Sequence, residues 1–483
     1  MKRHLLKNAF AWMPALLLGG ALALPSVSNG AESVAPIGVK VPANQRFVLP
    51  NGLTIVLVPR KDVPLIAFSG FVRGGVLADP ADKPGVSSLV AGLLDRGAGK
   101  RSAFEFADAV EGVGGTFNAS AGSEAISVGG QFLARDRALM IELLADALMR
   151  PRFDATEFSN YRDREIEFIK SAKDSDPSQI MGIYGRAALF GNHPYGRPQG
   201  GSERTLAAIT QSDVVSFHAG NFGADRATLV FAGDLDPKWM KQAVTTAFGA
   251  WAKAKAPAVA LKPAPRVTGR HVVLVDSPGS VQTYFWIGNV GVNRRYSGRP
   301  ALDLVNTLYG GRFTSILNTE LRIKSGLSYS ASSRFTRGTV PGDFAIRSFT
   351  QTENTAKALD LTLETLEQLK RGALAPEMLE SARAYVLGQF PLQLETAAHW
   401  ATALADLELY GLNKDYIEGY GPAVTKVDLA ETAAVTADAF PRPADLVIVL
   451  VGDAAKIREA AAKYGPVAEM KISDPDFAPP KLP

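Results

Sequence analysis

Two side chains in one short segment, Arg322 and Tyr329, have the types and the spacing to do chemistry together. Arginine carries a permanently charged fork of donors, and a phenol adds one more donor. The run Phe313 to Lys324 has helical periodicity, and the alternation that begins at Leu327 predicts a strand. Arg322 should then lie at the helix end and Tyr329 on the strand, so that both can donate to one oxygen atom. On these residues alone, an arginine that covers a helix end and a tyrosine packed in a sheet is an equally good interpretation.

The elements that must position this pair can be placed from hydrophobic periodicity. Helices are predicted over residues 86–94, 103–113, 135–149, 156–173, 178–190, 213–220, 355–370 and 376–389, with another that begins at Ala301. Apolar runs predict strands over residues 64–75, 116–121, 125–132, 226–234, 272–275, 281–290 and 446–453. In addition, Asn51-Gly52 divides residues 47–60 into the two arms of a hairpin.

These elements fall into two similar sets. Gly233-Asp234 and Gly452-Asp453 end comparable apolar strands, and Pro84-Gly85 and Arg299-Pro300 each precede a helix at a similar offset. Between the sets, residues 252–269 are rich in Ala, Pro and Lys and have no periodicity, which is typical of a linker. The sequence therefore predicts an α+β fold made of two homologous α/β-sheet halves.

Composition limits the classes of function. The chain has 483 residues, 46% of them hydrophobic and 21% charged, which is typical of a folded protein with large cores. It contains no cysteine, and this excludes thiol catalysis and cysteine-ligated metal sites. The formal net charge of +4 falls to about +1 without the three basic residues of the first 30 positions, so nothing favours nucleic-acid binding.

The N-terminal 30 residues have the pattern of a secretory signal peptide. Lys2, Arg3 and Lys7 precede an apolar run from Ala15 to Leu24, and small and polar residues follow. Cleavage is expected after Ala23 or after Gly30, and the sequence leaves both open. A permanent membrane anchor is the alternative, but the run is shorter than the roughly 20 residues that span a bilayer. We expect an exported, periplasmic protein without a transmembrane span after removal of the leader.

The segment Leu321-Arg322-x-x-x-Gly326-Leu327-x-Tyr329 resembles the pitrilysin and mitochondrial processing peptidase family of zinc metallopeptidases. The resemblance extends over nearly all of the chain that follows the leader, including the structural turn His193-Pro194-Tyr195-Gly196. It implies a clam-shell arrangement in which the first half binds zinc. It also implies that Arg322 and Tyr329 from the second half bind the substrate carbonyl and stabilise the oxyanion.

The zinc motif of that family is degenerate in this chain. Aligning Gly85 with the family pattern Gly-x-x-His-x-x-Glu-His puts Ser88 and Gly92 at the histidine positions and Ala91 at the position of the general base. None of these three can hold a metal or activate a water. No two of the five histidines are near each other in the sequence, so we expect no metal or other cofactor in this chain. The family's third ligand falls near Glu165 and Glu167, which are better interpreted as solvated helix charges.

Two hypotheses about function remain. In the first, the chain is the zinc-free subunit of a heteromeric peptidase. A homologous partner with His-x-x-Glu-His would hold the zinc, and Arg322 and Tyr329 would act on an extended peptide substrate. In the second, the chain is a catalytically inactive peptide-binding or scaffolding homologue. The expected organisation is a signal peptide (1–30), an N-terminal peptidase-like domain (31–251), a linker (252–269) and a C-terminal peptidase-like domain (270–483).

Overall fold

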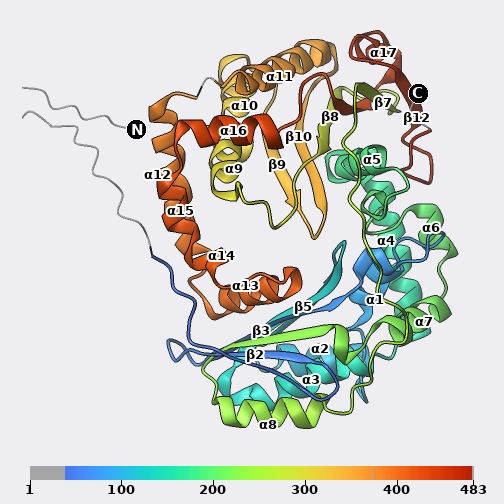
Figure 1. The fold of residues 1–483 in the computed structure, drawn as a ribbon. Helices are drawn as coiled ribbons and strands as arrows, with labels where there is room; N and C mark the ends of the chain where they lie inside the picture. Colours follow the sequence, from blue (N-terminus) through green and yellow to red (C-terminus); the bar gives the residue numbers. More distant parts are fainter. Residues whose placement is uncertain (1–37, 373, 481–483) are drawn as a thin grey trace, which may run out of the picture. The chain divides into compact units, whose positions relative to one another are not determined.

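The strands of the described chain form two six-stranded sheets, one from each half of the sequence (Figure 1). The computed structural model describes residues 38–372 and 374–480. These belong to one compact unit, which spans Pro36–Pro483. The signal peptide expected from the sequence, with both candidate cleavage positions, lies outside the described residues.

The first sheet has the strand order β1-β2-β6-β3-β5-β4. Its strands are β1 (Gln45–Val48), β2 (Thr54–Pro59), β3 (Leu65–Arg73), β4 (Thr116–Ala121), β5 (Ala125–Leu133) and β6 (Ala227–Gly233). β2 and β6 are parallel and all other neighbours are antiparallel. The predicted hairpin at Asn51-Gly52 is confirmed as the β1–β2 turn, where Gly52 has a φ of 98° that favours glycine.

The second sheet has the strand order β12-β7-β11-β8-β10-β9. Its strands are β7 (Arg270–Asp276), β8 (Gln282–Val290), β9 (Ala331–Arg337), β10 (Pro341–Gln351), β11 (Leu446–Gly452) and β12 (Val467–Lys471). β11 is buried along its whole length because it lies inside the sheet with both faces covered, and its sequence is correspondingly apolar throughout.

The two sheets repeat one topology. In the first sheet, β6 pairs in parallel with β2 and antiparallel with β3. In the second sheet, β11 pairs in parallel with β7 and antiparallel with β8. An aspartate follows the terminal glycine of both central strands, β6 and β11. One edge differs, because β1 forms a hairpin with β2 whereas β12 arrives from the C-terminal part of the chain and runs parallel to β7. The predicted fold class, two α/β-sheet halves of the same type, is confirmed.

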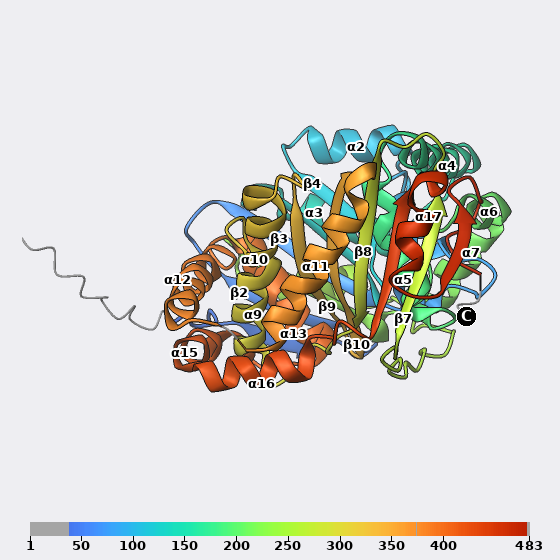
Figure 2. The same cartoon turned by 90° about the horizontal axis from the view of Figure 1, so that it is seen from above.

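Helices cover the sheets. Those of the first half are α1 (Val86–Leu93), α2 (Ala103–Glu111), α3 (Arg137–Met149), α4 (Ala155–Ser175), α5 (Ser178–Phe190), α6 (Glu203–Ala208), α7 (Gln211–Asn221) and α8 (Pro237–Phe248). Those of the second half are α9 (Arg299–Asn306), α10 (Ile316–Asn318), α11 (Thr355–Lys370), α12 (Pro376–Leu392), α13 (Ala397–Tyr410), α14 (Asp415–Glu418), α15 (Tyr420–Lys426), α16 (Leu429–Ala439) and α17 (Ala454–Ala462). Figure 2 shows α11 and α17 lying along the second sheet.

Each half lends one helix to the sheet of the other half. α5 packs on β8 and β11, while α13 packs on β3 and β6 (Figure 1). The α5 contact is close, because an added Cβ at Gly185 would lie 2.3 Å from the fully buried indole of Trp286. As a result, both hydrophobic cores contain residues from both halves. The domain boundaries expected at residues 251 and 270 remain a prediction, although no helix or strand lies between α8 and β7.

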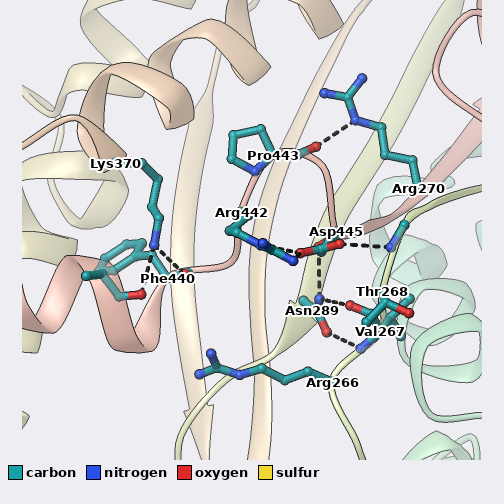
Figure 3. Close-up of polar contacts among 12 residues, drawn as sticks. Arg266, Val267, Thr268, Arg270, Asn289, Lys370, Phe440, Arg442, Pro443 and Asp445 are labelled. Carbon is teal, nitrogen blue, oxygen red and sulfur yellow. Dashed lines mark hydrogen bonds and ion pairs between the residues drawn. The ribbon is translucent and has the colours of Figure 1, made fainter.

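Polar contacts fix the end of the linker to the second sheet (Figure 3). The buried amide of Asn289 donates to the carbonyls of Val267 and Asp445 at 2.9 and 2.8 Å, and it accepts from the Val267 N–H at 2.9 Å. The Asp445 carboxylate accepts from the Gly269 N–H at 2.9 Å and from Arg442 Nε at 2.6 Å. Since the donors and the acceptor of this buried amide are satisfied, the linker enters β7 in one defined geometry.

The C-terminal tail folds back onto the first half. The side chain of Phe477 is only 2% exposed, and Asp476 accepts a hydrogen bond from Ser202 Oγ at 2.6 Å. Lys173 Nζ donates to the carbonyl of Asp474 at 2.6 Å. Within residues 38–372 and 374–480, no helix has the length and apolarity to cross a membrane.

Candidate functional site

Helix α1 carries the positions of the degenerate zinc motif. A carboxylate holds its N-terminus, because Asp79 accepts from the N–H groups of Gly85 at 2.7 Å and of Ser87 at 2.9 Å. Gly85 has a φ of 104°, which a residue with a Cβ rarely adopts. Asp79 is only 4% exposed, and its burial raises the pKa of the carboxyl to about 7 despite these hydrogen bonds.

The side chains of Ser88 and Ala91 both have structural roles. The hydroxyl of Ser88 donates to the carbonyl of Gln199 at 2.6 Å, which ties α1 to the loop before α6. Ala91 is 1% exposed and belongs to the first hydrophobic core. Neither position presents a group that can bind a metal or move a proton.

Gly92 lies directly against Tyr161 of α4. An added Cβ at Gly92 would be 2.0 Å from the phenolic oxygen and 2.1 Å from Cζ. Two guanidinium groups lie against the Tyr161 ring, with Cζ of Arg96 at 5.2 Å and Cζ of Arg164 at 4.7 Å from its centre. Tyr161 therefore fills the space beside α1 that a ligand side chain from position 92 would need.

The residues present do not fit a zinc ion. Neither α1 position that would supply a ligand has a donor atom available, and no group of three or more His, Cys, Asp or Glu residues in the described chain could hold a metal. Glu165 lies 3.8 Å from Arg164 and Glu167 lies 2.8 Å from Lys170, as expected for helix charges.

Two histidines outside the leader, His193 and His218, have structural surroundings. His193 Nδ1 accepts from the Tyr195 N–H at 3.1 Å, and its Nε2 lies 2.8 Å from the carbonyl of Lys262. The expected structural role of the His193 turn is thus confirmed. His218 Nε2 contacts the carbonyl of Leu148 at 2.9 Å, and burial lowers the pKa of this histidine.

The structure brings Arg322 and Tyr329 together. Cζ of Arg322 lies 4.3 Å from the centre of the Tyr329 ring and 4.8 Å from the centre of the Phe313 ring. Tyr329 is 70% exposed and Phe313 is 61% exposed, so the stack faces solvent and not a core. This excludes the alternative of a tyrosine packed inside the sheet.

The local structure around the pair differs from the prediction in two respects. The predicted helix from Phe313 to Lys324 is a short α10 followed by a π-helix, η6 (Thr319–Lys324), and Phe313 lies ahead of both. The strand begins at Ala331 and not at Leu327, so Tyr329 lies in the connecting loop. Hydrogen bonds to the loop explain this, because its carbonyls accept from side chains of β10.

Two such hydrogen bonds hold the loop beside β10. The Thr350 hydroxyl donates to the carbonyl of Leu327 at 2.6 Å, and the Ser348 hydroxyl donates to the carbonyl of Ser330 at 2.8 Å. Leu327 and Ser330 lie on either side of Tyr329 in the sequence, so the backbone is held on both sides of this residue. None of the polar or cation–π contacts in the described residues joins this pair to α1.

Two side chains of this region were missed by sequence reasoning. Phe313 completes the stack on Arg322, and Tyr161 fills the space beside Gly92. The pattern Tyr161-x-x-Arg164 on the predicted helix 156–173 could have indicated a ring and a guanidinium on one face. No signal in the sequence pairs Tyr161 with Gly92, since they lie on separate helices.

Two family models match the chain. The model described as insulinase (peptidase family M16) matches residues 64–202, and the one described as the peptidase M16 inactive domain matches residues 208–386. An uncharacterized zinc protease of Mycobacterium tuberculosis is 28% identical over 395 residues, which are 81% of this chain and 90% of that protein.

Solved structures show the same fold. A peptidase M16 inactive domain from Pseudomonas fluorescens superposes with a TM-score of 0.79 at 21% identity, covering 85% of this chain and 98% of that one. The periplasmic protease PqqL from Escherichia coli superposes with a TM-score of 0.72 at 14% identity, covering 86% of this chain and 46% of that one. From the family matches and the paired six-stranded sheets, we conclude that this chain belongs to peptidase family M16, the pitrilysin-like metallopeptidases.

Proposed function

We propose that this chain is the zinc-free subunit of a heteromeric metallopeptidase. The partner would be a homologous subunit with an intact His-x-x-Glu-His motif, which would supply the zinc. This chain would supply Arg322, Tyr329 and one wall of the peptide chamber. The observation that carries the proposal is the contrast between an exposed, stacked Arg322–Tyr329 pair and an α1 that has no room for a ligand at position 92.

The pair suits an oxyanion. When a scissile carbonyl becomes tetrahedral, its oxygen gains negative charge, and donors aimed at that oxygen lower the barrier. The guanidinium of Arg322 and the phenol of Tyr329 are such donors, and their stacking holds them on one side of the loop. A role that needed only packing would not leave Tyr329 70% exposed.

The substrate proposed is an extended peptide. β4 lies at one edge of the first sheet and β9 at one edge of the second, so each has one side without a neighbouring strand among the described residues. An extended peptide can add to such an edge through main-chain hydrogen bonds, a mode with weak sequence preference. We further propose a periplasmic location, which is supported by the leader pattern and by the fold shared with the periplasmic protease PqqL.

The test is reconstitution. A tagged copy of the mature chain should capture from its own cells a homologue that carries His-x-x-Glu-His, and peptide cleavage should require both chains. The inactive peptide-binding or scaffolding homologue is the competing function. It would be supported if the two chains associate but the partner alone cleaves peptide as fast as the complex does.

A further inference from the structure

Two arginines on the second sheet have no role in the function proposed above. Arg334 of β9 lies opposite Ala345, and Arg347 of β10 lies opposite Ser332. Residues 345 and 347 are two apart on one strand and point to the same face, so Arg334 and Arg347 are diagonal neighbours on that face. We refer to this pair as the β9–β10 arginine patch.

The patch lies on the sheet face that receives α5. An added Cβ at Gly182 of α5 would be 2.6 Å from Nη2 of Arg347, which places that guanidinium against the helix. Arg186 follows one turn later on α5, and its Nε lies 3.9 Å from Oδ1 of Asp343. A third arginine, Arg186, therefore lies near the patch and is paired with the buried Asp343 carboxylate.

The charges of this cluster do not balance. Asp343 is 2% exposed and is paired with Arg186, whereas Arg334 and Arg347 form no ion pair or side-chain hydrogen bond within the described residues. Burial lowers the pKa of Arg347, the charge of Asp343 opposes this shift, and the charges of Arg334 and Arg186 add to it. Like charges on neighbouring strands repel each other, and a bound anion would offset this repulsion.

The patch is accessible and close in sequence to the proposed oxyanion site. Both Arg334 and Arg347 are exposed. Arg334 follows Tyr329 by five residues, a separation of at most roughly 17 Å even for a fully extended chain. A peptide that runs along this edge can therefore reach the pair and the patch together.

We propose that the β9–β10 arginine patch binds acidic side chains of an extended peptide, about five residues from the bond addressed by Arg322 and Tyr329. The position along the peptide rests on the proposed function, whereas the binding itself does not. A carboxylate fits because the planar guanidinium can donate two parallel hydrogen bonds to it. Alternate side chains of an extended strand lie about 7 Å apart on one face, which matches the spacing of diagonal neighbours. A Glu-x-Glu segment is thus the expected ligand.

The experiment uses the mature chain alone and two fluorescein-labelled peptides that differ only in Glu-x-Glu or Gln-x-Gln. Fluorescence anisotropy should show the Glu peptide binding at least roughly tenfold more tightly at low salt, and the difference should shrink as salt rises. The Arg334→Gln/Arg347→Gln variant should lose this preference. The control Arg135→Gln/Arg371→Gln removes two arginines with side chains 77% and 72% exposed, and it should keep the preference.

Equal affinity for the two peptides, or an unchanged preference in Arg334→Gln/Arg347→Gln, would overturn this inference. If the double variant does not fold, each single variant is measured in its place. The binding assay needs neither a partner subunit nor peptide cleavage. Its result therefore does not depend on whether the proposed function is correct. If the chain binds the Glu peptide selectively but the reconstituted complex does not cleave peptide, the proposed role as a peptidase subunit would be contradicted. The inference about the arginine patch would still be supported.

Discussion

The phenolic oxygen of Tyr161 lies where the side chain of any residue larger than glycine at position 92 would have to begin, 2.0 Å from an added Cβ. Two features are thus linked in space: α1 has no metal ligand at position 92, and a ring on α4 occupies the volume that such a side chain would need. Substituting a metal-binding side chain at position 92 therefore does not create the space that this side chain would need.

The first prediction concerns zinc. The purified chain should hold far less than one zinc per molecule after dialysis, and Ser88→His/Ala91→Glu/Gly92→His should not change this, because Tyr161 blocks position 92. Adding Tyr161→Ala to the triple variant should raise its zinc content. Metal analysis by mass spectrometry measures all three proteins. About one chelator-removable zinc in the unmodified chain would show that our interpretation of α1 is wrong.

The second prediction isolates the packing of Gly92 against Tyr161. Gly92→Ala should lower the free energy of unfolding by ~1 to 3 kcal/mol, because the methyl group overpacks the contact. The matched control is Gly388→Ala in α12, an exposed helical glycine with no atom within 4 Å of an added Cβ, which should stabilise by about 0.5 to 1 kcal/mol. Urea unfolding measures both, and a stabilising Gly92→Ala would contradict the model of a filled space.

The third prediction is a pH dependence at Asp79. The folded-state pKa is raised to about 7 by burial, while an unfolded aspartate titrates near 3.9, so the folded state binds the proton more tightly. The contribution of Asp79 to stability is therefore greatest below about pH 4 and falls as the pH rises to about 7. Asp79→Asn cannot titrate and keeps one acceptor for α1. As the pH rises from 4.5 to 7.5, the free energy of unfolding of Asp79→Asn should increase relative to that of the unmodified chain. Urea unfolding at each pH measures this difference, and a difference that does not change with pH would refute the assignment.

The fourth prediction concerns the C-terminal tail. Phe477 is buried edge-on against Tyr184, with ring centres 5.0 Å apart, and Lys173 Nζ lies 5.3 Å from the Phe477 ring. Phe477→Ala should cost ~3 to 5 kcal/mol of stability because it leaves a cavity between the tail and the first half. The conservative Phe477→Leu should cost clearly less. Equal, small effects of both changes in thermal unfolding would mean that the tail is not fastened there.

Hydrophobic periodicity was sufficient to predict many elements of the repeated fold, but β10, α13, α16 and β12 were not predicted. The strands that end at Gly233 and Gly452 and the helices that follow Gly85 and Arg299 were all expected, because each depends on a local apolar pattern. The reciprocal packing of α5 and α13 was not predicted, since a buried helix has the same periodicity whichever sheet it covers. The π-helix η6 and the late start of β9 were missed because tertiary hydrogen bonds, such as Thr350 to Leu327, override the local pattern.

For the candidate site, the sequence supplied the residues and the structure supplied their surroundings. Arg322 and Tyr329 could be selected from spacing, but the stacking of both Phe313 and Tyr329 on Arg322 depends on a loop conformation that no periodicity specifies. The role of the pair in catalysis stays a prediction.

The last prediction tests that role in the reconstituted complex. Tyr329→Phe keeps the ring that stacks on Arg322 and removes only the hydroxyl, so folding and association with the partner should not change. Loss of one oxyanion donor typically costs ~2.7 to 4 kcal/mol, so kcat should fall roughly 100- to 1000-fold. Arg322→Lys keeps the charge but loses the planar fork, and it should also reduce kcat. Phe313→Leu serves as the control, because it alters the stack without removing a donor, and it should affect kcat far less. Peptide turnover and partner binding are measured for each protein. Wild-type rates in both Tyr329→Phe and Arg322→Lys would reduce the pair to a packing role and favour the scaffolding homologue.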